Sequence, residues 1–270
     1  MIFDPLISAY DKQVFEREKF LPSSSAANRL LRWEQRLFQM ADIVIADTHL
    51  HAEYYEETLR VSHKNRHVIP VSAEEHLFFP IETVPRNRTE TRYRILYYGS
   101  YLALHGVETI IEAVLHNSEV AIDWIFIGDG PMRAMARERC SGLQNVRFVE
   151  WVEYKDLASD IHLADLVLGV FGMTDKARRV IPNKVYQALA CGRPVVTMRA
   201  DAYPSQLLES GQCGIYWIDA GDPQQLSDAI NRAMNSDFSS DCILARQSYE
   251  TYFSNTIVKE KIASVMQSLT

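Results

Sequence analysis

Short apolar runs alternate with longer amphipathic runs over most of the chain. Several apolar runs have the length and composition of buried strands, and they cover residues 93–99, 121–128, 145–151, 165–171, 194–198 and 213–218. Helix-length amphipathic runs lie between or after them, at residues 106–116, 131–140, 154–164, 183–190 and 222–234. Apolar strands that alternate with helices are typical of βαβ units, whose parallel sheet is covered on both faces. The pattern therefore predicts an α/β fold with a Rossmann-like parallel sheet domain over residues 83–237.

The first part of the chain has the same pattern with fewer strands. Strand-like runs cover residues 1–4, 42–47 and 66–71, and a helix is predicted over residues 48–60. A further helix is indicated by apolar residues at helical spacing, namely Leu30, Trp33, Leu37 and Met40. At most three strands are too few for an independent doubly wound domain. Residues 1–82 are therefore predicted to form an incomplete N-terminal α/β remnant.

A polar segment separates these two parts. Residues 80–94 contain two prolines and several polar residues without apolar periodicity, which is typical of a linker. After residue 237 the sequence predicts two C-terminal helices over residues 238–270. The second of these has one apolar stripe, which must pack on another part of the protein and consists of Val258, Ile262, Val265 and Leu269.

The charge balance bears on the class of partner. The chain has 28 basic and 35 acidic residues and a formal net charge of −7. Proteins that bind the phosphate backbone of nucleic acids usually carry a basic excess, so we expect no nucleic-acid partner. With 47% hydrophobic and 23% charged residues the chain has the composition of a globular protein, which excludes wholesale disorder.

Membrane and compartment signals are weak. No apolar run approaches the roughly 20 residues that a transmembrane helix needs, and the first residues do not resemble a signal peptide. The cysteines lie far apart without a C-x-x-C pair, which argues against a disulfide framework or a zinc site and favours the cytoplasm. His49 and His51 are two residues apart and face different ways on a helix, so we interpret both as surface residues.

Two strand ends carry residues suited to a phosphate, because ligands of open α/β sheets bind beyond the carboxyl ends of the strands. Gly99 ends one strand, and Ser100, His105 and Gly106 follow it before a helix. Glycine allows close approach of the backbone, while serine and histidine can donate hydrogen bonds. The same residues also fit a plain connecting loop.

The second strand end is Gly128-Asp129-Gly130, which is similar to the start of a dinucleotide-binding glycine motif. Arg133 occupies the position of the third glycine, so the motif is incomplete. A tight structural turn explains these residues equally well.

A third candidate lies at residues 177–197, where a helix starts beside basic residues. If Pro182 is the first helical residue, Ile181 is the cap and offers no side-chain oxygen to the first N–H groups, which are then available to an anion. Asn183 could be the cap instead. Lys184 and Gln187 are three residues apart and share a helix face.

Arg178 and Arg179 lie just upstream of this helix start. Together with Lys184 they would suit a diphosphate, because charge-assisted hydrogen bonds are the strong ones. The alternative is a solvated basic loop.

In order, these segments resemble the nucleotide-binding half of the GT-B glycosyltransferases, and specifically the large retaining family four. The resemblance covers residues 41–236 and is strongest over residues 94–222. It rests on an ordered set of motifs: "ILYYGSYLALHGVETIIEA", "WIFIGDGPMR", "NVRFVEWV", "LADLVLGVF", "VYQALACGRPVVT" and "SGQCGIYWIDAGDPQQLSDAI". Upstream, "ADIVIADT" and "HVIPVSAEEHLFFP" look like the end of the acceptor domain and the crossover into the donor-binding half.

The resemblance implies transfer of a sugar, with retention, from a UDP- or GDP-linked donor to a sugar or lipid-linked acceptor in surface polysaccharide or glycoconjugate synthesis. It implies no cofactor and no metal, because basic groups and helix dipoles can stabilise the departing diphosphate. It assigns catalytic roles to Arg179 and Lys184. It assigns donor binding to Gly99, Ser100, His105, Gly106, Gly128, Trp151, Val152, Asn183 and Gln187, with Gln187 at the ribose. It also implies that the C-terminal helices pack back towards the N-terminal part.

Two departures from the family pattern leave alternatives open. Arg179 and Gln187 stand where the family has two glutamates, and arginine cannot accept a hydrogen bond. Either Asp175 takes the first role, or Arg179 binds phosphate or an acidic sugar. Most of the acceptor half is also missing, which is compatible with a truncated enzyme, with a partner chain or second copy that completes the N-terminal sheet, or with a non-catalytic nucleotide-sugar-binding module.

Overall fold

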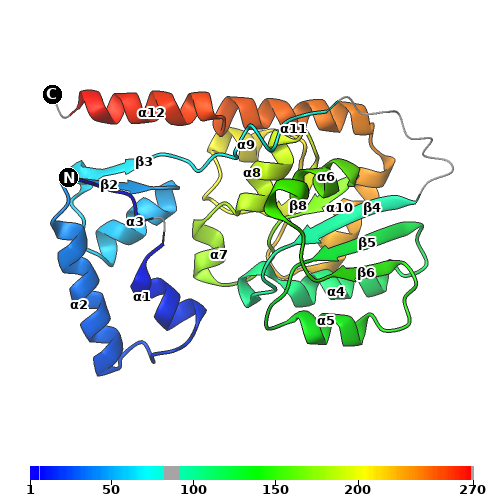
Figure 1. Ribbon diagram of the computed structural model, residues 1–270, viewed down its shortest axis with the longest axis horizontal. Coiled ribbons are helices and arrows are strands. Elements are labelled where there is room, and N and C mark those ends of the chain that lie inside the picture. Colours follow the sequence, from blue (N-terminus) through cyan, green and yellow to red (C-terminus); the bar gives the residue numbers. More distant parts are fainter. Residues whose placement is uncertain (6, 82–91, 269–270) are drawn as a thin grey trace.

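Two α/β parts lie side by side and are bridged by the C-terminal helices (Figure 1). The computed structural model describes residues 1–5, 7–81 and 92–268. In these ranges a three-stranded sheet belongs to the N-terminal part and a six-stranded sheet to the larger part. All paired strands are parallel, which confirms the predicted α/β fold with a Rossmann-like sheet. The predicted boundary between residues 82 and 83 lies outside the described residues.

The larger sheet has the strand order β6-β5-β4-β7-β8-β9. Its strands are β4 (Tyr93–Tyr98), β5 (Ile122–Ile127), β6 (Val146–Val149), β7 (Leu166–Leu168), β8 (Val195–Met198) and β9 (Ile215–Ile218). The chain runs outward from β4 to β6 and then returns to pair β7 with the other side of β4. In open parallel sheets this reversal marks the edge where ligands bind, at the carboxyl ends of the strands.

Each face of this sheet is covered by helices. They are α4 (Val107–His116), α5 (Arg133–Arg139) and α10 (Pro223–Asn235) on one face, and α6 (Leu157–Leu163), α8 (Asn183–Ala190) and α9 (Ser205–Glu209) on the other. Alternate residues of β4 serve the two cores: Ile95 and Tyr97 pack with α4, whereas Leu96 and Tyr98 pack with α8. Because successive strand residues point to opposite faces, a strand covered on both sides is mostly apolar, as β4 is apart from half-buried Arg94.

The N-terminal part has the strand order β1-β2-β3. Its elements are β1 (Ile2–Phe3), α1 (Ala9–Asp11), the π-helical turn η1 (Lys12–Glu16), α2 (Ser25–Gln39), β2 (Ile43–Ala46), α3 (His49–Glu57), the 3-10 turn η2 (His63–Asn65) and β3 (Arg66–Val68). The sequence pattern did not predict α1 or η1. Their position is fixed by buried Glu34, whose carboxylate accepts hydrogen bonds from the backbone N–H groups of Ala9 and Tyr10 at 2.6 and 2.8 Å.

The interpretation of His51 as a surface residue is wrong. Thr48 caps α3, and this start turns His51 into the core against Tyr55. The His51 ring is buried, with Nδ1 2.6 Å from the Asp47 carboxylate. His49, on the other face of the helix, is exposed.

The C-terminal helices α11 (Phe238–Tyr252) and α12 (Asn255–Gln267) run along both parts (Figure 1). Ala245 and Tyr249 of α11 join the core beside α8. Val265 of α12 packs with Ile43 and Ile69 of the N-terminal part. The predicted apolar stripe of α12 is narrower than expected, because Ile262 is exposed, and Leu269 lies outside the described residues. No helix in the described ranges combines the length and apolarity needed to cross a bilayer.

Candidate functional site

A small pocket of about 260 Å³ opens where the loops after β4, β5 and β6 meet. It brings together several residues that the sequence assigned to donor binding, namely Gly99, Ser100, Gly128, Trp151 and Val152. The other lining residues are the acidic Asp129 and the apolar or aromatic Tyr98, Ile127, Tyr154 and Leu157. Trp151 exposes 74% of its surface at the mouth. A flat aromatic or heterocyclic group fits such a lining.

Glycines allow the loops of this pocket to touch. Gly128 has φ +116°, and a Cβ placed there would lie 2.2 Å from the Gly99 carbonyl oxygen. A Cβ on Gly130 would lie 1.7 Å from the Ser100 carbonyl oxygen. Gly106 has φ +66° and leads into α4 directly against the Phe171 backbone. The sequence left open whether these glycines serve a ligand or a structural turn, and at Gly106, Gly128 and Gly130 close contacts of the backbone with itself require glycine.

The side chain of Lys184 ends beside Gly99. It belongs to the first turn of α8, is buried, and holds its Nζ 4.3 Å from the centroid of the Tyr97 ring. A Cβ on Gly99 would lie 3.3 Å from this Nζ. The Nζ has no hydrogen-bond partner in the described part of the chain. Burial lowers the pKa of the Lys184 ammonium to about 7. A buried cation without a counter-charge is costly, so the position favours binding of an anion.

His105 also lies beside Gly99, at the end of the 3-10 turn η3 (Ala103–His105), and a Cβ on Gly99 would lie 2.9 Å from its Cε1. Burial, together with the nearby charge of Lys184, lowers the pKa of His105 to about 2, so the ring is neutral. Its Nδ1 is 2.9 Å from the Tyr97 hydroxyl. Burial raises the pKa of Tyr97, so its hydroxyl stays protonated and can donate a hydrogen bond to Nδ1. In the tautomer that accepts this hydrogen bond, Nε2 is an N–H donor. We call Gly99, His105 and Lys184 the cradle.

Helix α8 covers residues 183–190, as the amphipathic run predicted, but neither of the two caps considered from the sequence is formed. The helix begins at Asn183 and its N-cap is Pro182, so neither Ile181 nor Asn183 is the cap. Proline has no side-chain oxygen, and no side chain caps this helix. The first turn therefore keeps the partial positive charge of an uncapped helix start, beside the cradle.

Gln187 does not present its amide to the small pocket. It is buried, its Oε1 accepts a hydrogen bond from the Tyr98 hydroxyl at 2.9 Å, and its Nε2 donates to the Tyr154 hydroxyl at 3.0 Å. Tyr154 in turn donates to the carboxylate of Glu74 at 2.5 Å. Sequence reasoning missed Glu74 and Tyr154, because no local motif links a residue before the linker to one that follows β6.

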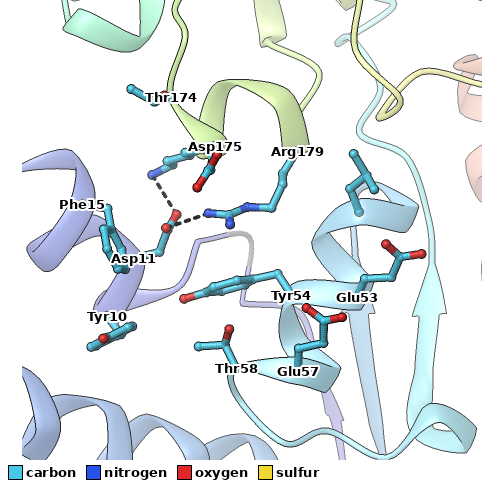
Figure 2. A pocket seen from close by; sticks show the side chains of 12 residues that line it. Tyr10, Asp11, Phe15, Glu53, Tyr54, Glu57, Thr58, Thr174, Asp175 and Arg179 are labelled. Carbon is cyan, nitrogen blue, oxygen red and sulfur yellow. Dashed lines mark hydrogen bonds and ion pairs between the residues drawn. The ribbon is translucent and has the colours of Figure 1, made fainter. Parts of the chain in front are cut away.

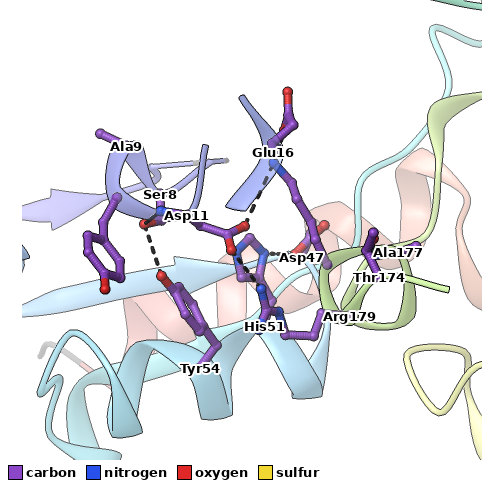
Figure 3. Close-up of polar contacts among 12 residues, drawn as sticks. Ser8, Ala9, Asp11, Glu16, Asp47, His51, Tyr54, Thr174, Ala177 and Arg179 are labelled. Carbon is purple, nitrogen blue, oxygen red and sulfur yellow. Dashed lines mark hydrogen bonds and ion pairs between the residues drawn. The ribbon is translucent and has the colours of Figure 1, made fainter. Parts of the chain in front are cut away.

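Arg179 is engaged by the N-terminal part (Figure 3). It ends α7 (Asp175–Arg179), a helix that the sequence pattern did not predict. Its guanidinium donates to buried Asp11 at 2.8 Å and lies 4.4 Å from the centroid of the Tyr54 ring. Lys176 pairs with Asp11 and Glu16, and Arg178 is exposed. The predicted cluster of Arg178, Arg179 and Lys184 is therefore not formed around one anion: its members have separate surroundings.

A larger pocket of about 610 Å³ lies between α7 and the N-terminal part (Figure 2). Aromatic rings and carboxylates dominate its lining, which includes Tyr10, Phe15, Tyr54, Glu53, Glu57 and Asp175. Asp175 is exposed at the start of α7. The segment before α7 connects this pocket to the cradle, because the N–H of Phe171 donates to the His105 carbonyl at 3.1 Å. Such a lining can stack on a sugar ring and accept hydrogen bonds from its hydroxyls.

The lowered pKa of Lys184 makes the free energy of unfolding depend on pH. Its pKa is about 7 in the folded protein and 10.5 ordinarily, so between these values the unfolded chain binds more protons. The free energy of unfolding should therefore rise with pH in this window, by at most about 1.4 kcal/mol per pH unit. Urea unfolding at pH 7, 8 and 9 measures this slope. In Lys184→Met the slope should be smaller, and equal slopes in both proteins would contradict the assignment.

The family described as "Glycosyl transferases group 1" matches residues 92–236, which is more than half of the chain. No curated protein sequence matches.

Within the described residues, no group of three or more His, Cys, Asp or Glu side chains is placed to hold a metal ion.

Solved structures share the fold. HepE from Anabaena, in complex with UDP and glucose, aligns with a TM-score of 0.73 and 17% identity over 99% of this chain and 71% of its own. Sucrose-phosphate synthase from Thermosynechococcus elongatus aligns with a TM-score of 0.71 and 18% identity, over 99% of this chain and 67% of the synthase. A glycosyltransferase from Rickettsia africae aligns with a TM-score of 0.70 and 11% identity, over 89% of this chain and 67% of its own length. At these identities the likeness concerns the fold, and it confirms the GT-B architecture predicted from the sequence.

Proposed function

Since the chain belongs to the glycosyl transferases group 1 family, we propose that it transfers a sugar with retention from a nucleotide-diphosphate sugar bound at the cradle. The observation that carries this proposal is the buried Lys184 Nζ, which has no partner among the described residues and lies beside Gly99. A diphosphate there would supply the missing counter-charge, and His105 would donate a hydrogen bond to it.

The nucleobase belongs in the small pocket on this proposal. Trp151 at the mouth offers an aromatic face, and Tyr98 and Ile127 offer an apolar floor. A base there leaves the diphosphate pointing towards Gly99 and the uncapped start of α8. The solved HepE structure holds UDP and glucose, which makes UDP and UDP-glucose the first ligands to test, followed by their guanosine counterparts.

The reaction follows from where charge develops. As the bond between sugar C1 and the diphosphate oxygen breaks, negative charge grows on the diphosphate, where Lys184 and the dipole of α8 stabilise it. The acceptor hydroxyl oxygen bonds to C1 from the same side, and its proton passes to the departing oxygen. This route retains the configuration at C1 and requires neither an enzyme-bound sugar nor a metal ion.

The acceptor belongs in the larger pocket. Its rings and carboxylates suit the hydroxyl-rich surface of a glycan, which fits a role in polysaccharide or glycoconjugate synthesis. A second candidate function is a nucleotide-sugar-binding module without transfer. It is favoured by one observation, the engagement of Arg179 by Asp11 where the family pattern has a glutamate.

Thermal unfolding with added nucleotides tests the proposal. A ligand at 100 times its Kd should add about 2.7 kcal/mol to the free energy of unfolding. We expect UDP, GDP or their sugars to stabilise the protein, and we expect release of sugar from the donor when an acceptor glycan is added. Absence of stabilisation by every nucleoside diphosphate would overturn the donor site, whereas tight binding without sugar release would favour the binding module.

A further inference from the structure

The segment around Glu74, between β3 and β4, has a fixed conformation beside Tyr154, a residue of the small pocket. The carbonyl of Glu74 accepts hydrogen bonds from the N–H groups of Leu77 and Phe78 at 2.8 and 2.9 Å, and the Phe78 ring is fully buried. Before Glu74, the Ala73 N–H donates a hydrogen bond to the Tyr249 hydroxyl at 3.3 Å. After it, the Glu75 carboxylate accepts a hydrogen bond from the Asn255 N–H at 2.8 Å. The Glu74 backbone is therefore held by both the core and the C-terminal helices.

The carboxylate of Glu74 is exposed and nearly unused. It accepts one hydrogen bond, from the Tyr154 hydroxyl at 2.5 Å, and no basic side chain of the described residues pairs with it. Tyr154 lines the small pocket, and Glu74 itself does not, so this carboxylate lies one hydrogen bond away from a lining residue. An ionised carboxylate has capacity for several hydrogen bonds, and most of that capacity is open here.

A directed chain of hydrogen bonds fixes Tyr154 in place. Tyr98 donates to Gln187, Gln187 donates to Tyr154, and Tyr154 donates to Glu74. The Tyr154 ring also packs against Phe78, with the centroids 5.6 Å apart. Every donor in this chain points towards Glu74, so the chain ends on an ionised acceptor, where hydrogen bonds are strongest.

We propose that Glu74 binds the ribose hydroxyls of the donor nucleotide. This inference rests on the proposed function, which puts the base in the small pocket and the diphosphate at the cradle, with the ribose between them. A vicinal diol offers two O–H donors, and a carboxylate accepts both with its two oxygens. Gln187 cannot serve in this way because both ends of its amide are already bound to Tyr98 and Tyr154.

Calorimetric binding of matched nucleotides to the full chain tests this assignment. The probes are UDP and GDP, each beside its 2′,3′-dideoxy form. The wild-type protein should prefer the hydroxylated form of whichever nucleotide it binds by about tenfold or more, because hydrogen bonds to a charged acceptor are lost in the other. In Glu74→Ala this ratio should fall close to one, and in Glu74→Gln it should take an intermediate value.

Glu153→Gln is the matched control. Glu153 is an exposed carboxylate next to Tyr154 in the sequence, and its side chain has no hydrogen bond within the described ranges. Its removal changes the charge near the site but should leave the ratio between the two forms unchanged. A folded Glu74→Ala protein that keeps the wild-type ratio, or a wild-type protein with no preference for the hydroxylated form, would overturn the role of Glu74. A wild-type protein that binds no nucleotide would overturn the proposed function, and this inference with it.

Discussion

Replacement of Lys184 by methionine should weaken nucleoside diphosphate binding by about 100-fold, because loss of a buried charge partner leaves the bound anion unpaired. The same change should raise the free energy of unfolding of the ligand-free protein at pH 7 by about 2 kcal/mol. The reason is that the buried Lys184 Nζ has no hydrogen-bond partner among the residues that the structure describes. Replacement of a residue with a purely structural role would not weaken nucleotide binding and at the same time raise the free energy of unfolding.

Calorimetry with UDP and GDP, together with urea unfolding, measures both effects. Arg178→Met is the matched control, because Arg178 is an exposed cation a few residues away. It should change either quantity little. Arg179→Met is expected to lower stability, since it leaves buried Asp11 with less positive charge. Unchanged nucleotide affinity in Lys184→Met would remove this lysine from the donor site.

Gly128→Ala should destabilise the protein by about 3 kcal/mol or more, because both backbone strain and overpacking act at this position. The new Cβ would lie 2.2 Å from the Gly99 carbonyl oxygen, and φ is +116°. The loops after β4 and β5 would have to separate, so nucleotide affinity should also fall. Urea unfolding and calorimetry measure the two effects.

Gly142→Ala separates strain from contact. Gly142 also has a positive φ, of +91°, but a Cβ there meets no atom within 4 Å. This control should cost about 1–2 kcal/mol, as expected for strain alone. Equal losses in both variants would show that the contact between the loops contributes nothing.

The sequence indicated which loops of the candidate site meet, but it did not indicate side-chain partners that lie far apart in the chain. Gly99, Ser100, Gly128, Trp151 and Val152 share one pocket as the sequence reasoning implied. Parallel strands bring their carboxyl ends to one edge, so the loops that follow them must meet. Arg179 was assigned to a diphosphate from its neighbours in sequence, yet its partner is Asp11, 168 residues away. No spacing rule within residues 177–197 could have indicated that carboxylate.

The sequence by itself determined the elements and their layering. Strand and helix periods are local, and a strand such as β4 must be apolar on both sides if helices cover both faces of the sheet. Tertiary structure alone decided the side-chain partners: Arg179 pairs with Asp11, Gln187 is hydrogen-bonded to two tyrosines, and the Lys184 Nζ has no hydrogen-bond partner within the described residues. Hydrogen bonds and ion pairs depend on distances of a few ångströms between segments far apart in the chain, and local periodicity carries no information about those distances.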